Sequence, residues 1–172
     1  QNFTGLSANN AISGYVAGGT GAYVLQNLPS TFATLTTGSA ASNTATIGLK
    51  TNGTADALAE TVGSTSGAGS SSALTLNATQ IESLSIKSQG ANGNSVTTGL
   101  TNAGDGVTAA TSSTATQMTS LTITGNKNLT YTGSANDVLA TVTATGFTGD
   151  TLSVATGSLA ATTFTSGGVT AV

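Results

Sequence analysis

The chain repeats a ten-residue phrase. Residues 78–87 read ATQIESLSIK and residues 115–124 read ATQMTSLTIT, a separation of 37 residues. Self-similarity at about 20 to 50 residues is typical of repeat architectures, in which each unit buries its apolar face against its neighbours. The repeat therefore predicts stacked coils of about 20 residues, roughly two for each repeated unit and about eight for the whole chain.

Apolar residues alternate with Thr and Ser along much of the sequence. In a β-strand, a spacing of two residues places the apolar side chains on one face and the polar ones on the other. Turn-forming groups rich in Gly, Asn and Asp, such as residues 90–94 and 102–106, separate the alternating stretches. Residues 54–62 come closest to a helical period and would allow one short helix. The clearest alternating pairs are Leu74 and Leu76, Leu84 and Ile86, Leu121 and Ile123, Leu129 and Tyr131, and Leu152 and Val154.

Together the repeat and the alternation favour an all-β fold, a right-handed parallel β-solenoid of short strands. Its inward Leu, Ile and Val side chains would stack in columns, with Leu84 near Leu121. A Greek-key β-sandwich, in which the two similar strands arise by chance, is the alternative. We interpret residues 1–172 as a single β-rich domain, a segment of a larger protein, in which the Gly/Ser-rich residues 63–72 form a loop.

Charged residues are sparse. The chain has three Lys, six acidic residues, no Arg and no His, for a net charge of −3. It therefore lacks the basic surface that nucleic acid or anionic lipid would require. No Cys is present, which excludes disulfides, thiolate metal sites and a cysteine nucleophile. The absence of a long uninterrupted apolar run predicts no membrane span.

Four short phrases carry a resemblance to a known family. They are TADAL at residues 54–58, NATQIESLSI at 77–86, LTITGN at 121–126 and VLATVTATGFTG at 138–149. In this order they resemble the repetitive regions of bacterial surface-layer proteins and large secreted adhesins of the RTX (repeats-in-toxin) type. The resemblance covers most of residues 50–155. It implies a β-helical segment of an extracellular lattice or adhesin at the cell surface, usually dependent on calcium.

The residues that could bind calcium lie in the predicted turns. Residues 18–25, GGTGAYVL, are similar to the calcium nonapeptide of RTX proteins, but Tyr23 stands where the charged Asp ligand belongs. A lone Asp in a turn can bind calcium through its carboxylate or can instead form an Asx-turn, and both interpretations stay open. The candidate calcium ligands, each beside Gly, Asn or a turn, are Asp56, Asp105, Asp137 and Asp150.

The composition predicts no enzymatic activity. Without His or Cys, a Ser or Thr nucleophile would need one of three Lys or six scattered carboxylates as its base. A β-helical polysaccharide-binding or lyase-like domain is the enzymatic alternative, because Lys50, Lys87 and Lys127 could align in one exposed column of a solenoid.

The function expected from these observations is structural. We expect an extracellular segment that self-associates into a surface layer or forms an adhesin stalk, with calcium assisting and cell-surface polysaccharide as a further partner. A pilus-like filament subunit, with a β-sandwich core completed by a strand donated from a neighbour, is the second structural alternative.

Overall fold

The protein folds as two β-sheets. The computed structural model describes residues 14–17, 21–29, 31–37, 41–51, 53, 55–63, 72–78, 80–99, 118–133, 139–155 and 163–166. Within these residues it contains thirteen strands and no helix. The seven strands of the odd sheet are β1 (Gly14–Ala17), β3 (Thr34–Thr37), β5 (Ala57–Val62), β7 (Ser83–Ser88), β9 (Ser120–Gly125), β11 (Thr141–Phe147) and β13 (Thr163–Ser166). The six strands of the even sheet are β2 (Gly21–Leu28), β4 (Ala41–Leu49), β6 (Ser72–Asn77), β8 (Asn94–Gly99), β10 (Leu129–Thr132) and β12 (Leu152–Ala155).

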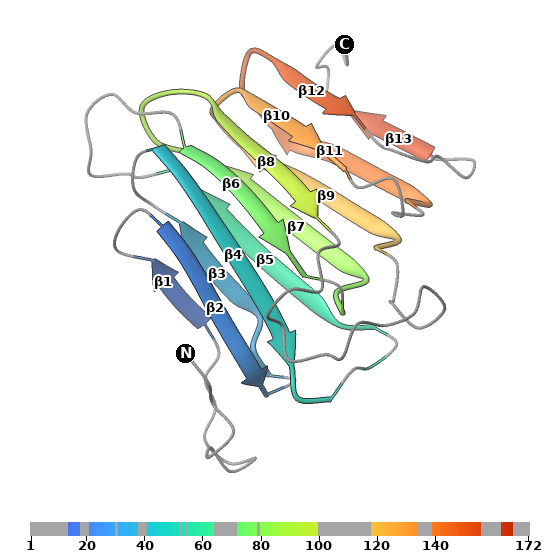
Figure 1. Cartoon of the computed structure of the whole chain (residues 1–172). Coiled ribbons are helices and arrows are strands. Elements are labelled where there is room, and N and C mark those ends of the chain that lie inside the picture. Colours follow the sequence, from blue (N-terminus) through green and yellow to red (C-terminus); the bar gives the residue numbers. More distant parts are fainter. Residues whose placement is uncertain are drawn as a thin grey trace.

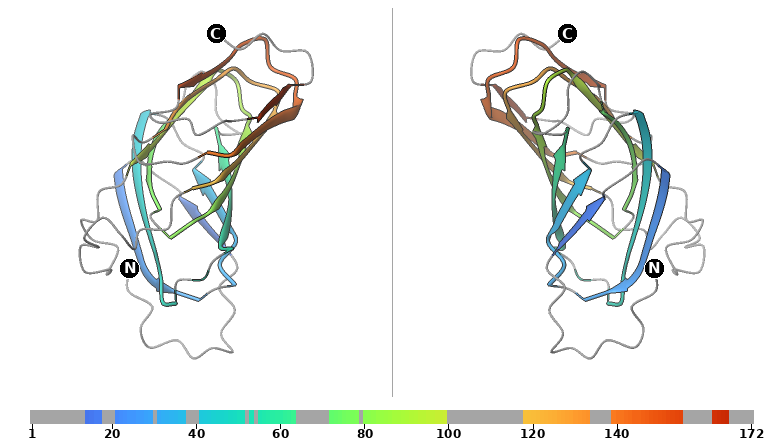
Figure 2. Two further views of the ribbon diagram at one scale, coloured as in Figure 1. Left: turned by 90° about the vertical axis from the view of Figure 1, so that its right-hand side faces the viewer. Right: turned by 90° about the vertical axis from the view of Figure 1, so that its left-hand side faces the viewer.

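Consecutive strands alternate between the two sheets. Each strand therefore lies beside the strand two places earlier and the strand two places later, and every one of the described pairings is parallel. The two sheets form facing layers, and the strands advance in sequence order along the stack (Figures 1 and 2). This path is consistent with the expected parallel β-solenoid. The alternative Greek-key sandwich is not observed, because that architecture pairs its strands antiparallel.

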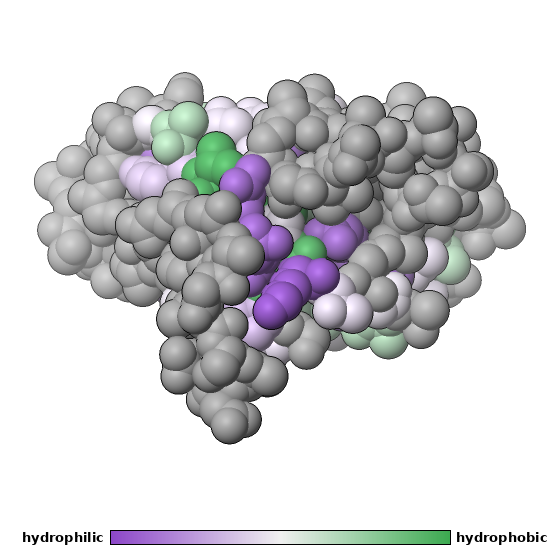
Figure 3. All heavy atoms as spheres, turned by 60° about the horizontal axis from the view of Figure 1, so that its bottom comes forward, coloured by the Kyte–Doolittle hydropathy of each residue, from purple (hydrophilic) through white to green (hydrophobic). Residues whose placement is uncertain are grey.

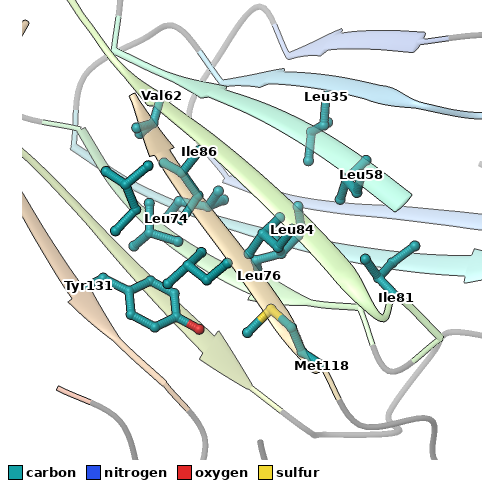
Figure 4. Close-up of a cluster of buried hydrophobic side chains, with 14 of the residues drawn as sticks. Leu35, Leu58, Val62, Leu74, Leu76, Ile81, Leu84, Ile86, Met118 and Tyr131 are labelled. Atoms are coloured by element: carbon teal, nitrogen blue, oxygen red, sulfur yellow. The ribbon is translucent and has the colours of Figure 1, made fainter. Parts of the chain in front are cut away.

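The alternating pattern forms the strands in the expected way. In β7, for example, Leu84 and Ile86 are buried while Lys87 is exposed. The other predicted inward residues are buried too, except Val154, which is half-buried against the core. Side chains from both sheets meet between the layers (Figure 4). Full burial of each such Leu or Ile stabilises the fold by roughly 1.5–3 kcal/mol, so the stacked columns supply the main driving force.

The ten-residue repeat occupies two neighbouring strands. Leu84 lies beside Leu121, and Ile86 beside Ile123, which confirms the predicted column. The prediction of two coils per repeat is wrong, since the 37 residues from Ser83 to Ser120 make a single step from β7 to β9. The step from Leu121 to Val142, between β9 and β11, takes only 21 residues. Coil length therefore varies, and the described residues form fewer coils than the eight expected.

The short helix allowed for residues 54–62 is not formed. Residues 57–62 form β5, with Leu58, Glu60 and Val62 facing inward. Because one of the three inward residues is the acidic Glu60, the sequence of this strand does not show the usual two-residue alternation of apolar side chains. Pairing with β3 on one side and β7 on the other satisfies the backbone of this segment and overrides its weak helical pattern.

The chain turns out of the odd sheet through glycines in the left-handed region. Gly63 has a φ of +97° after β5, and Gly125 has a φ of +107° at the end of β9. A side chain at Gly125 would collide with the carbonyl oxygen of Ser88 on the preceding coil. That carbonyl accepts a hydrogen bond from Asn126 N (3.0 Å), so it cannot move away without breaking this link between the two coils.

We expect the Gly125→Ala substitution to lower the free energy of unfolding by about 1–3 kcal/mol, because it adds both backbone strain and a collision. Urea denaturation measures the loss. The control is Gly21→Ala, since Gly21 also has a positive φ of +138° but open space around it. A loss at Gly125 no larger than the loss at Gly21 would contradict the close approach of the two coils.

Candidate functional site

Among the described acidic and basic residues, Glu60 is the most deeply buried. It lies on β5 between Leu35 of β3 and Ile86 of β7, and it is 1% exposed. The hydroxyl of Thr37 donates a hydrogen bond to its Oε1 (2.7 Å), while its Oε2 has no hydrogen-bond partner among the described residues. Burial raises the pKa of Glu60 from 4.5 to about 8, and hydrogen bonds from Thr37 lower it only in part. At neutral pH Glu60 is therefore a neutral acid.

The surroundings of Glu60 do not make it a catalytic group. No group of three His, Cys, Asp or Glu side chains gathers anywhere in the described part of the chain. The nearest lysine in register, Lys87 of β7, is exposed on the opposite face of the same sheet. The sequence gives one signal for this residue: Glu60 stands two residues from both Leu58 and Val62, so it shares their inward face.

A second buried acid, Glu82, joins two coils at the entry to β7. Its Oε2 accepts a hydrogen bond from Asp56 N (2.6 Å), and its own backbone N donates to Asp56 O (3.0 Å). Asp56 in turn accepts a hydrogen bond from Gly53 N through Oδ2 (2.6 Å), which closes the turn before β5. The carboxylates of this corner are thus used to hold backbone amides. Glu82 Oε1 is buried with no partner among the described residues.

The side chain of Gln80, the last residue of the first Ala-Thr-Gln phrase, links two segments of the stack. Its side-chain Oε1 accepts a hydrogen bond from Leu49 N (2.7 Å), and its Nε2 donates to Leu49 O (3.4 Å). The amide therefore pairs with both backbone groups of one residue at the end of β4, as a neighbouring strand would. Gln117, the equivalent residue of the second phrase, lies outside the described residues.

The predicted calcium ligands are not brought together where the structure describes them. Asp56 precedes β5 of the odd sheet, and Asp150 is exposed in the corner before β12 of the even sheet. Asp150 N donates to Asn128 Oδ1 (3.0 Å), an anchor between neighbouring corners. Asp105 and Asp137 lie outside the described residues. Asp56 and Asp150 therefore do not share one site within the chain, since they lie in corners beside different sheets.

The three lysines do not form the column considered for a polysaccharide lyase. Lys87 lies in β7, and its neighbours in register are Thr61 and Thr124. Lys50 follows β4 in the other sheet, and Lys127 lies in the corner between β9 and β10. The regular spacing of lysines in the sequence does not produce alignment, because the coils differ in length.

Two shallow surface hollows contain no charged residue. One, of about 410 Å³, lies at the start of β8 and β10 and includes Ser95, Asn128 and Thr130. The other, of about 270 Å³, lies over the odd sheet and includes Ala57, Ser85 and Thr122. Neither holds an acid or base for catalysis. At the lower end of the molecule as drawn in Figure 1, hydrophilic side chains adjoin small hydrophobic patches (Figure 3).

The comparisons with known proteins give no family for this chain. No model of a protein family, no curated protein and no solved structure matches it. Among the described residues there is no helix long and apolar enough to cross a membrane. The features of this chain that bear on its function are the arrangement of the sheets, their edges and their surfaces.

Glu60 predicts that stability falls as the pH rises. Below pH 4.5 the acid is protonated in both folded and unfolded chains, whereas up to about pH 8 only the folded chain keeps the proton. The folded state loses stability relative to the unfolded state throughout this window, by on the order of 5 kcal/mol in all. We expect Glu60→Gln to remove most of this slope, as measured by urea denaturation from pH 4.5 to 8.5.

The matched control is Asp150→Asn, which neutralises an exposed carboxylate and should keep the wild-type slope. A Glu60→Gln protein that loses stability with rising pH as steeply as the wild type would contradict the assignment of this effect to Glu60.

Proposed function

We propose that the chain is a structural segment of an extracellular bacterial surface protein. It is a right-handed parallel β-solenoid that self-associates into a surface layer or forms the stalk of an adhesin. The observation that carries this proposal is the edge strand at each end of both sheets. Among the described strands, β1 and β13 of the odd sheet, and β2 and β12 of the even sheet, each have a neighbouring strand on one side only.

The edge formed by β12 presents backbone groups to a neighbour. Thr151 O and Ala155 O accept hydrogen bonds from the β10 side, from Leu129 N (3.0 Å) and Gly133 N (2.7 Å). Since backbone groups alternate in direction along a strand, those of Leu152 and Val154 point toward the open edge. None of the four edge strands contains a charged residue, so the edges lack the charges that commonly prevent pairing with another strand.

The parallel stack also supports this proposal over the alternatives. A pilus-like subunit completed by a donated strand would have an antiparallel sandwich core, whereas the described pairings are parallel. The proposal includes no enzymatic activity. Glu60 and Glu82 are buried in the wall of the stack, and the lysines lie apart from one another.

We expect Val154→Pro to weaken end-to-end association. Proline removes the edge amide at this position but leaves the amides that pair with β10 in place. One lost hydrogen bond and the added ring should raise the concentration needed for assembly about tenfold or more. Sedimentation velocity measures the shift, and negative-stain electron microscopy shows rod length.

Val154→Ala is the matched control, since it shortens the side chain but keeps the amide. It should assemble like the wild type. Rods of Val154→Pro as long as those of Val154→Ala, formed at the same concentration, would argue against assembly through this edge.

We propose that calcium ions bind between two copies of the chain and not within one copy. Six acidic residues against three Lys leave each copy negative, so acidic corners repel when copies approach. Asp150 is exposed in such a corner, and its carboxylate can share a divalent ion with a neighbouring copy. We expect a chelator to disperse the assemblies without changing the melting temperature, because the core of each copy is held by columns of buried apolar side chains.

Electron microscopy and thermal melting of one sample, with calcium and with chelator, test this expectation. Asp150→Asn should make assembly insensitive to the chelator. Wild-type assemblies that survive the chelator unchanged would remove calcium from the proposal.

A further inference from the structure

The even sheet contains no charged residue in any of its six strands. From β4 to β12 its outward surface carries threonine and other small side chains. Thr44, Thr75, Thr97 and Thr132 stand side by side in register on four consecutive strands. Three of them, Thr75, Thr97 and Thr132, are exposed, and Thr44 is half-buried.

A second column runs parallel to the first, two residues earlier on each strand. It consists of Ala73, Ser95, Thr130 and Ser153, again in register. The two columns form what we call the threonine face, and the hollow of about 410 Å³ lies beside its second column. Because inter-strand spacing in a sheet is constant at about 4.8 Å, the hydroxyl and methyl groups repeat regularly along the stack.

The described charges lie elsewhere on the molecule. Lys87 projects from the outer surface of the odd sheet, while Lys50, Lys127 and Asp150 lie in the corners. Packing another molecule against the odd sheet would bury or crowd an unpaired ammonium group, which is costly. Packing against the threonine face desolvates no charge. A neutral surface is complementary to another neutral surface, and a second copy of this chain supplies an identical one.

The area of the threonine face indicates how strongly two copies can bind through it. The five strands that carry the two columns, about 4.8 Å apart, span about 19 Å. The columns with their flanks are about 13–20 Å wide, so the face measures roughly 250–400 Å². A stable pair of proteins buries about 800 Å² on each partner. A single copy therefore holds another only weakly through this face. Copies already joined end to end present many such faces in a row, and their contacts add.

We infer that the threonine face is the lateral contact between assembled copies, packed against the same face of a second copy. The inference rests on the proposed self-association and adds a direction to it: edges join copies along the stack, and threonine faces join neighbouring stacks side by side. Small side chains allow the close approach, and their hydroxyls can hydrogen-bond to one another across the contact.

The test introduces a charge at the centre of the face. Thr97→Lys places an ammonium group on the exposed column, where two copies would bring like charges together. Thr141→Lys is the matched control, because Thr141 is an exposed outward residue of the odd sheet. Thr97→Ser is a second control that keeps the hydroxyl. Thermal melting confirms that each variant is folded, and electron microscopy shows whether the assemblies are single rods or laterally packed sheets.

We expect laterally packed sheets from the wild type, Thr97→Ser and Thr141→Lys, and single rods from Thr97→Lys. The concentration needed for lateral packing should rise at least about tenfold in Thr97→Lys. Sheets from Thr97→Lys identical to those of the wild type would overturn the inference and leave the proposed function standing. The same holds if both lysine variants lose lateral packing equally. Wild-type protein that never assembles would overturn the inference and the proposed function together.

A different occupant of the face is also detectable. Retention of wild type but not Thr97→Lys on an insoluble neutral polysaccharide, with unchanged self-association of both, would assign the face to a saccharide. That result overturns the inference of a second copy.

Discussion

The parallel register between strands two places apart is the constraint on which this structure depends. It places Leu84 beside Leu121 and Ile86 beside Ile123, so that each coil adds its apolar residues to existing columns. A shift of one residue would turn every inward side chain outward. Because each coil contacts only its neighbours, segments of different length can be inserted between strands without disturbing the columns. The long step between β7 and β9 is tolerated for this reason.

Polar groups inside such a stack must be satisfied by the neighbouring coil. Gln80 pairs with the backbone of Leu49, and Glu82 holds the amide of Asp56, so both side chains replace missing strand partners at the corners. Glu60 is different, because it lies within a strand, between the apolar residues Leu35 and Ile86 of the neighbouring strands, and its carboxyl accepts a hydrogen bond from the hydroxyl of Thr37. Remaining protonated lowers the cost of its burial, and this links the stability of the stack to pH.

The surfaces follow from the same periodicity. A parallel stack has two ends with unpaired strand edges, and its outward side chains form regular columns on each sheet. These edges and the threonine face contain no charged residue, while the described charged residues on the surface lie in the corners and at Lys87 of the odd sheet. The assembly in two directions that we propose uses both of these features, the edges along the stack and the face beside it.

The sequence by itself determined the strands, their inward faces and the column shared by the two ATQ phrases. It could do so because side-chain alternation and local repetition are properties of neighbouring residues. Coil length, the strand at residues 57–62 and the environments of Glu60 and Asp56 were decided by the tertiary structure. Those features depend on which residue of an adjacent coil lies alongside. Coils of unequal length set that pairing, so sequence spacing alone did not place the lysines correctly.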